Sequence, residues 1–455
     1  MRYVLPLQPP QRTLAMCLWQ HPRRLTESRW QVKDGAIAMV SIAQPLEKIA
    51  PLFEIVDLRP PSVPVCFSVA LPARRALDDI AGFPPAALPG RGRMASGRGL
   101  DGDAARASCL GEAAELVSCC AWGDEGVITA AAAELGDTAL HPRALLGLSD
   151  HQYAQRRTWN NTMDGFDWRP SPCGESRIID WMEVRDAFSD QVFHAPADLM
   201  LIGRREAGDE AAVGIADSNG CASGDNLDQA KLFACLELIE RDAVARWWYG
   251  RRGRNAVDLA TIRNPTALID FLHDRDRRTL LFDIASDLAI PVYAAVSSER
   301  DGSDVAIGSA ALPDADAAAN GALTEMLQME VSLDMARRAA GKAGTWDIWR
   351  KEVTMAAPPL CLAAPGQPLV RPFADIYRAE WLSVVLGASK AAGVSLYFAD
   401  MTRPSLGVPV IRGLSAHLCH YKPRFGRARL LAFDGRDSKR ADESLHRPNA
   451  RYLLV

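Results

Sequence analysis

Hydrophobic and polar positions follow two different periods along this chain. Short apolar runs rich in β-branched residues lie at positions 65–69, 280–284 and 290–296, and they predict buried strands. Alanine-rich amphipathic stretches predict helices over residues 103–120, 227–247 and 316–340. The mixture of the two patterns predicts an α/β or α+β fold.

Other stretches follow neither period, and we expect them to form loops and chain ends. The expected loops are a Pro- and Gly-rich stretch over 83–102, a polar stretch over 156–175 and the chain from 436 onward. We predict an N-terminal extension over 1–43, one main domain over 44–430 and a C-terminal tail over 431–455. The aromatic triplet at 247–249 is expected to pack the end of its helix.

Three places along the chain share one layout, in which a small Ser- and Gly-rich loop precedes a helix with acidic or amide side chains three residues apart. The three sets are Ser96 with Glu112 and Glu115, Ser218 with Glu237 and Glu240, and Ser309 with Glu325 and Gln328. The serine precedes the first glutamate by 16, 19 and 16 residues (112 − 96, 237 − 218 and 325 − 309). These similar offsets predict a repeated supersecondary unit.

The paired glutamates are the most informative feature of these units. Side chains three residues apart lie on the same face of a helix, so the carboxylates of Glu112 and Glu115, and those of Glu237 and Glu240, repel each other. Each pair is either a solvated face neutralised by a neighbouring arginine or a site for a cation. Oxygen ligands suit Mg²⁺, and glycine-rich loops before helices suit phosphate. Because the layout recurs, we expect a metal–nucleotide site.

Other chemical motifs are weaker or absent. Residues 97–102 match GxGxxG, but a proline-rich stretch and not a strand precedes them, so we expect no Rossmann site. The sequence contains no GxxxxGK[ST], which excludes an ordinary P-loop. His417 and His420 flank Cys419 without a second His/Cys cluster, so they are expected in a core or substrate pocket and not at zinc. No cysteine carries a recognisable nucleophile signature.

Composition excludes several classes of protein. Lys and Arg number 52 against 56 Asp and Glu, a net charge of −4, so we expect no nucleic-acid partner. We also expect no membrane association, since no stretch approaches the ~18 apolar residues of a membrane helix. The chain begins without the apolar core of a signal peptide, and its ten cysteines include no CxxC pair. We therefore expect reduced thiols and a cytoplasmic protein.

Two sequence blocks, SNGCASG at 218–224 and ELIERDA at 237–243, closely resemble the YcaO family, whose members use ATP to activate peptide backbone amides. The resemblance extends over residues 44–430. It includes the first glutamate pair, the helix with Glu325 and Gln328, and the segments DMTRP at 400–404 and GVPV at 407–410. It implies a YcaO-like fold of repeated loop–helix units packed on mixed β-sheets, with ATP and Mg²⁺ as cofactors and no P-loop.

The resemblance also implies roles for individual residues. Mg²⁺ and phosphates would be held by Glu112, Glu115, Glu237 and Glu240, and phosphate would be contacted by Arg241. The nucleotide pocket would be lined by Ser96, Arg98, Ser218, Asn219 and Asp225. The residues implied in catalysis are Arg241, Glu325 and Gln328.

The implied activity is cyclodehydration of Cys, Ser or Thr in a ribosomally synthesised precursor peptide to thiazoline or oxazoline. A leader-peptide-binding partner protein is expected, and a flavin-dependent dehydrogenase if azolines are oxidised. The assembly would be a homodimer or a hetero-oligomeric synthetase complex.

The chain departs from the common family pattern at Arg98, Leu116, Asp225 and Gly321, where Lys, Arg, Asn and Arg are frequent. It also lacks the PxPxP ending of many azoline formers. Two alternatives follow: thioamide formation with a TfuA-like partner, or a catalytically inactive scaffold in a modification complex.

Overall fold

The structure is a computed structural model of the 455-residue chain. It describes residues 45–60, 63–73, 94–162, 167–263, 266–338, 345–430 and 432. The predicted N-terminal extension and, apart from residue 432, the predicted C-terminal tail lie outside the described residues, and the domain boundaries at 44 and 430 stay predictions. No helix in the described ranges is both long and apolar enough to cross a membrane.

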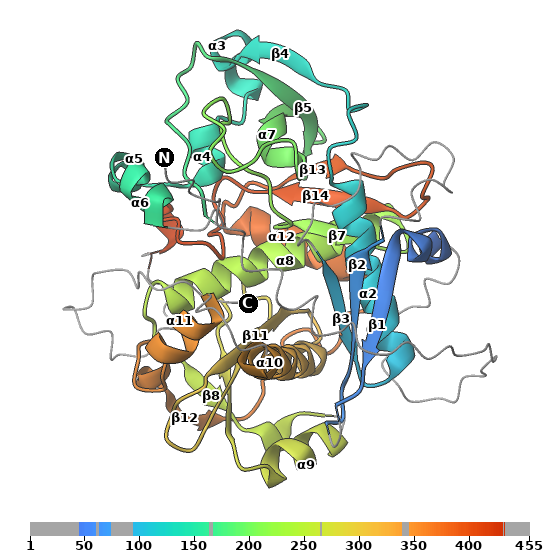
Figure 1. The fold of residues 1–455 in the computed structure, drawn as a ribbon, viewed down its shortest axis with the longest axis vertical. Coiled ribbons are helices and arrows are strands. Elements are labelled where there is room, and N and C mark those ends of the chain that lie inside the picture. The colour runs from blue at the N-terminus through green and yellow to red at the C-terminus, as the bar shows by residue number, and fades with distance from the viewer. Residues whose placement is uncertain are drawn as a thin grey trace, which may run out of the picture.

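The described strands form three sheets (Figure 1). The first is an antiparallel sheet of β1 (Phe53–Leu58), β2 (Cys66–Pro72) and β3 (Ala95–Gly99). The second contains β4 (Ile128–Ala131), β5 (Ile178–Asp186), β6 (Val192–Pro196), β7 (Cys221–Ser223), β13 (Tyr397–Asp400) and β14 (Val410–Leu414). The third contains β8 (Asn255–Val257), β9 (Arg278–Asp283), β10 (Val292–Ser298), β11 (Ala306–Ala311) and β12 (Ala364–Gln367).

Three long helices pack against these sheets. Helix α2 (Gly102–Ser118) lies on β2 and β3, and α10 (Ala315–Arg338) lies on β10 and β11. Helix α8 (Leu227–Trp248) runs through the middle of the molecule and contacts β7 and β14 as well as β11 (Figure 1). All three helices were predicted within two residues of their observed ends. The α+β prediction is also confirmed, because most strand pairs are antiparallel.

Shorter elements connect and cover these layers. The helices are α3 (Ala132–Leu135), α4 (Pro142–Leu146), α5 (Asp150–Ala154), α6 (Arg156–Thr162), α7 (Ala197–Met200), α9 (Thr266–Asp274), α11 (Thr345–Glu352) and α12 (Trp381–Ala391). Short 3-10 helices lie at Pro45–Lys48, Ala50–Leu52, Gly136–Thr138, Leu259–Thr261, Leu360–Leu362, Arg378–Glu380 and Ala428–Leu430. The predicted loop over 156–175 is therefore partly helical.

The C-terminal end of α8 lies in the largest apolar cluster of the described residues. Trp247, Trp248 and Tyr249 are almost completely buried, as their sequence predicted. The Trp248 ring stacks on Trp349 of α11 with centroids 5.6 Å apart, and Trp247 contacts Phe282 of β9 at 5.8 Å. These contacts fix α8 against the third sheet and thereby fix Glu237 and Glu240, which lie about two to three turns earlier on the same helix.

The three predicted repeats are present, but each begins with a strand where the sequence predicted a loop. Each strand is followed by a helix whose first turn is capped by a side-chain carboxylate or amide. The caps are Asp101, Asn226 and Asp314, and each precedes the first glutamate of its helix by 11 residues (112 − 101, 237 − 226 and 325 − 314). By this alignment, Cys221 and not Ser218 is the counterpart of Ser96 and Ser309.

The glycines that suggested phosphate-binding loops serve close strand–helix packing instead. A Cβ at Gly97 would lie 2.1 Å from the backbone nitrogen of Cys109 on α2. A Cβ at Gly308 would likewise lie 2.1 Å from the backbone nitrogen of Met326 on α10. Because only glycine permits this approach, small residues are required where ordinary strands carry larger ones.

Candidate active site

The first glutamate of the first and third helices is held by the strand of its own unit. The backbone N–H of Ser96 donates to Oε2 of Glu112 at 3.0 Å, and the hydroxyl of Ser96 lies 3.4 Å from the same oxygen. In the third unit the backbone N–H of Ser309 donates to Oε2 of Glu325 at 2.6 Å. The strand therefore fixes the carboxylate that follows it by 16 residues.

On each helix, the second of the two side chains spaced three residues apart is contacted by the strand of another unit. These second side chains are Glu115, Glu240 and Gln328. Ser223 on β7 donates its backbone N–H and its hydroxyl to Oε1 of Glu115, at 2.8 and 2.9 Å. The Ser309 hydroxyl on β11 donates to Oε1 of Glu240 at 2.6 Å. Arg98 on β3 donates to Oε1 of Gln328 at 3.3 Å. These three contacts join the units in a cycle: second to first, third to second, and first to third.

The cycle brings five carboxylates into one electrostatically coupled ring. Its members in order are Glu112, Glu115, Glu237, Glu240 and Glu325, and each lies near enough to the next to influence its charge. Arg98 and Arg241 are the cations beside them: Arg98 lies 3.7 Å from Glu325, and Arg241 lies 3.9 Å from Glu237. The ring therefore contains more acidic than basic groups.

Burial and mutual repulsion oppose ionisation of these carboxyl groups. Burial raises the pKa of Glu115 well above its usual value, and Glu237 and Glu112 add to the increase despite the hydrogen bonds from Ser223. Burial also raises the pKa of Glu237 to about 8, although the positive charge of Arg241 favours the ionised carboxylate. The side chains of Glu237 and Glu325 still keep 25% and 19% of their surface exposed, so a ligand can reach them.

This donor set fits Mg²⁺ that is shared with a nucleotide. Burial disfavours the charge on Arg241, but Glu240, Glu237 and Glu325 outweigh it and raise the pKa of that guanidinium, which stays cationic. No three His, Cys, Asp or Glu side chains in the described ranges are close enough to enclose a metal ion by themselves. Mg²⁺ usually takes one or two carboxylates and completes its shell with water and substrate phosphates. Arg98 and Arg241 lie beside the ring, where phosphate oxygens would need positive charge.

The predicted site residues divide into two groups in the structure. The residues brought together on the ring are Ser96, Arg98, Glu112, Glu115, Glu237, Glu240, Arg241, Glu325 and Gln328. Ser218 and Asp225 are exposed at the two ends of β7, and Asn219 lines a neighbouring pocket. The nucleotide-binding roles of these last three residues stay predictions.

Sequence reasoning missed two kinds of contact. It named neither Ser223 nor the hydroxyl of Ser309 as a partner of a glutamate, although Ser223 precedes its first glutamate by the same 14 residues as Arg98. It also missed Tyr421, whose ring lies 5.1 Å from the Arg241 guanidinium carbon. His420 lines a pocket and pairs with Asp217, as expected for it. The same expectation is wrong for His417, which is exposed and accepts from the backbone N–H of Ser395.

The comparison with protein families identifies the class of this fold and site. The model of YcaO cyclodehydratases, described as ATP- and Mg²⁺-binding, matches residues 96–419. The chain belongs to the YcaO family, and the resemblance seen in its sequence is confirmed.

Similar solved structures and relatives agree with this membership. A heterocyclase in complex with substrate and cofactor is 30% identical, with a TM-score of 0.73, over 85% of this chain and 54% of that one. The YcaO protein of Methanopyrus kandleri bound with AMPPCP and Mg²⁺ shares the fold, with 17% identity and a TM-score of 0.56 over 84% of this chain and 90% of that one.

The chain is also similar to a curated relative that is described by its place in its own genome. It is an uncharacterized protein in the tfuA 3′ region of Rhizobium leguminosarum bv. trifolii, 29% identical over 228 residues, which are 46% of this chain and 53% of the relative. The chain thus spans about half the length of this relative and of the heterocyclase.

Proposed function

We propose that this protein uses ATP and Mg²⁺ to activate backbone amides of a ribosomally synthesised precursor peptide and cyclodehydrates Cys, Ser or Thr to azolines. The observation that carries the proposal is the ring of five carboxylates with Arg98 and Arg241 beside it. Membership of a family of ATP- and Mg²⁺-binding cyclodehydratases supports it.

In the proposed reaction the nucleophile belongs to the peptide. Its thiol or hydroxyl adds to the preceding carbonyl carbon, and the resulting oxyanion takes the terminal phosphoryl group of ATP. Phosphate then leaves with the former carbonyl oxygen while the amide nitrogen gives up its proton, so the peptide loses one water. Mg²⁺ would supply charge neutralisation at the transferring phosphoryl group.

The residues of the chain orient and neutralise the reacting groups. Glu115 and Glu240 are held for cation binding by Ser223 and Ser309, while Arg98 and Arg241 would stabilise phosphate oxygens as negative charge develops. The attacking sulfur or oxygen comes from the peptide, so the proposed chemistry requires no cysteine nucleophile in this chain.

A mass-spectrometric experiment tests the activity. A cognate precursor peptide is incubated with this protein, its partners, ATP and Mg²⁺, and each azoline appears as a loss of about 18 Da. Glu237→Ala with Glu240→Ala should abolish the loss, whereas alanine at the exposed Glu210 should not. Unchanged turnover in the double variant would refute the site assignment.

Thioamide formation is the second candidate, favoured by the relative from the tfuA 3′ region. The same activation followed by attack of a sulfur donor, with a TfuA-like partner, would replace oxygen by sulfur and add about 16 Da. The scaffold alternative predicts no rise in melting temperature with Mg²⁺ and ATP, because a ligand stabilises only a protein that binds it.

The proposal also includes specific partners and an assembly. They are a leader-peptide-binding protein, a flavin-dependent dehydrogenase where azoles are the product, and assembly as a homodimer or synthetase complex. We place the protein in the cytoplasm, supported by the free thiol state of all its described cysteines. Co-purification with proteins encoded next to this gene would test the assembly.

A further inference from the structure

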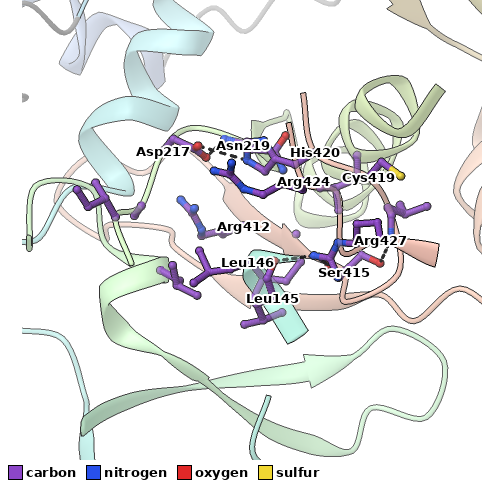
Figure 2. A pocket seen from close by; sticks show the side chains of 17 residues that line it. Leu145, Leu146, Asp217, Asn219, Arg412, Ser415, Cys419, His420, Arg424 and Arg427 are labelled. Atoms are coloured by element: carbon purple, nitrogen blue, oxygen red, sulfur yellow. Dashed lines mark hydrogen bonds and ion pairs between the residues drawn. The ribbon is translucent and has the colours of Figure 1, made fainter. Parts of the chain in front are cut away.

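A second pocket adjoins the carboxylate ring but contains none of its glutamates. Figure 2 shows Arg412 of β14 between a group of polar side chains that includes Asn219 and His420 and the leucines Leu145 and Leu146 of α4. Leu238 of α8 also lines this pocket, one residue after Glu237 of the ring. The pocket and the ring therefore share α8.

Arg412 is a buried cation without a carboxylate partner among the described residues. Only 3% of its surface is exposed, and one of its terminal nitrogens donates to the sulfur of Cys221 at 3.1 Å. Its Nε has no hydrogen-bond partner in the described part of the chain. Among the described residues this guanidinium bonds only to a thiol, which is a weak acceptor, and Asp217 and Glu237 favour its charge without a direct contact.

The other charged groups around the pocket already have partners. Asp217 accepts from Lys422 at 2.8 Å and lies 3.3 Å from Nε2 of His420, while Arg424 pairs with Asp167 at 2.6 Å. The negative charge nearest to the pocket is thus engaged by Lys422. Asp217 and Glu237 act on Arg412 only from beyond ion-pair distance, so a direct acceptor for its guanidinium remains to be supplied by a ligand.

Arg427 adds a second guanidinium to the lining. It donates to the backbone carbonyls of Ala144 and Leu145 at 2.5 and 2.6 Å, and burial lowers its pKa to about 10. It also donates to the carbonyls of Ala416 and Ser415, so its guanidinium is held by backbone carbonyls.

The unpartnered atoms specify the chemistry of a ligand. Oδ1 of Asn219 has no donor among the described residues, and Nε of Arg412 has no acceptor there. A carboxylate would satisfy Arg412, an N–H would satisfy Asn219, and an aliphatic group would pack on the leucines. An acylated amino acid with a free carboxylate carries all three, whereas inorganic phosphate carries only the anion.

We propose that this pocket binds a carboxylate-bearing residue of the peptide substrate and so helps to select which peptides reach the carboxylate ring. This inference rests on the proposed function, because it takes the ligand to be part of the substrate peptide. The binding itself can be measured without ATP or Mg²⁺, so its failure and a failure of the proposed function are distinguishable.

The test compares two small probes that differ only at the terminal group, a carboxylate in one and a neutral carboxamide in the other. N-acetyl-leucine and its neutral amide, N-acetyl-leucinamide, are titrated into the full chain, with binding followed by ligand-detected NMR. A charge-assisted hydrogen bond in a buried site predicts that the acid binds roughly tenfold or more tightly than the amide. Equal binding of acid and amide, or no binding of the acid, would overturn the proposal.

Variants show where the probes bind, and a phosphate titration distinguishes a peptide carboxylate from inorganic phosphate as the ligand. Arg412→Gln should remove the preference for the acid, while Arg412→Lys should retain part of it, with unchanged melting temperature as the check on folding. Asn219→Ala should weaken both probes, because it removes the acceptor for their common N–H. Inorganic phosphate is titrated in parallel, and phosphate binding tighter than that of N-acetyl-leucine and lost in Arg412→Gln would reassign the pocket to phosphate.

Discussion

Replacing Ser309 by alanine isolates one contact that holds the carboxylate ring together. The hydroxyl of Ser309 donates to Glu240 at 2.6 Å, and Ser309 itself is 1% exposed. It is the one hydrogen bond to that carboxylate among the described residues. Its loss frees Glu240 to rotate away from the position in which it would bind Mg²⁺.

The structure ranks three such substitutions. A hydrogen bond to a charged acceptor contributes about 1.5–3 kcal/mol, and the lower end applies here because water can reach Glu240. Ser309→Ala should therefore weaken Mg²⁺-dependent nucleotide binding roughly tenfold. Ser223→Ala should cost less, roughly threefold, since the backbone N–H at 223 still donates to Glu115 at 2.8 Å. Ser96→Ala should have little effect, because its hydroxyl is 3.4 Å from Glu112.

Calorimetric titration of a non-hydrolysable ATP analogue at several Mg²⁺ concentrations measures this ranking. The shift should appear in the Mg²⁺ concentration at half-saturation and recover in Ser309→Thr, which keeps the hydroxyl. A general loss of structure would lower the melting temperature without changing the Mg²⁺ dependence. Equal effects of Ser96→Ala and Ser309→Ala would refute the reasoning, since only the second hydroxyl is a close donor.

Three further substitutions test the packing and electrostatics of the fold. Trp248→Ala removes the ring stacked on Trp349 and should lower the free energy of unfolding by about 3–5 kcal/mol in urea denaturation. Gly308→Ala places a methyl group against the backbone of Met326, so it should lower both the melting temperature and Mg²⁺-nucleotide affinity. His420→Gln should flatten the pH dependence of stability between about 4 and 6.5. Circular dichroism melts of wild type and variant across that range would check it, and parallel curves would contradict the assignment.

The sign of the His420 prediction follows from burial. Burial lowers the pKa of His420 to about 4, although Asp217 attracts the proton, while Arg424 and Lys422 repel it. The unfolded imidazole has a pKa of about 6.5, so between these values the unfolded state binds more protons than the folded state. Stability therefore rises with pH through this window. The stacked Tyr421 ring stays neutral there, because burial raises its pKa to about 12.

The sequence predicts the helices well and the strands of the repeats poorly. The long amphipathic helices carry many periodic positions, so their ends were predicted within two residues. Ser96–Gly99 and Gly308–Ala311 were expected to be loops because glycine, serine and alanine are unusual in strands. Their small side chains are needed because α2 and α10 approach the strand backbone at Gly97 and Gly308.

The candidate site was predictable only where it depends on local spacing. Glutamates three residues apart must share a helix face, so Glu112 with Glu115 could be recognised without the fold. Ser223 reaches Glu115 across 108 residues and Ser309 reaches Glu240 across 69, and no local pattern encodes those distances. The Arg412 pocket likewise combines residues of α4, α8 and β14, which are far apart in the sequence.

The three units differ at two equivalent positions, and these differences place a neutral amide and a guanidinium among the carboxylates of the ring. At the position where the first two helices carry Glu115 and Glu240, the third carries the neutral Gln328. At the strand position of Ser223, the first unit carries Arg98, which contacts Gln328. The ring therefore combines carboxylate acceptors for a cation with the guanidinium groups of Arg98 and Arg241 for an anion. A site that holds Mg²⁺ and phosphate side by side needs both, and a perfectly symmetric repeat of paired glutamates would provide only the first.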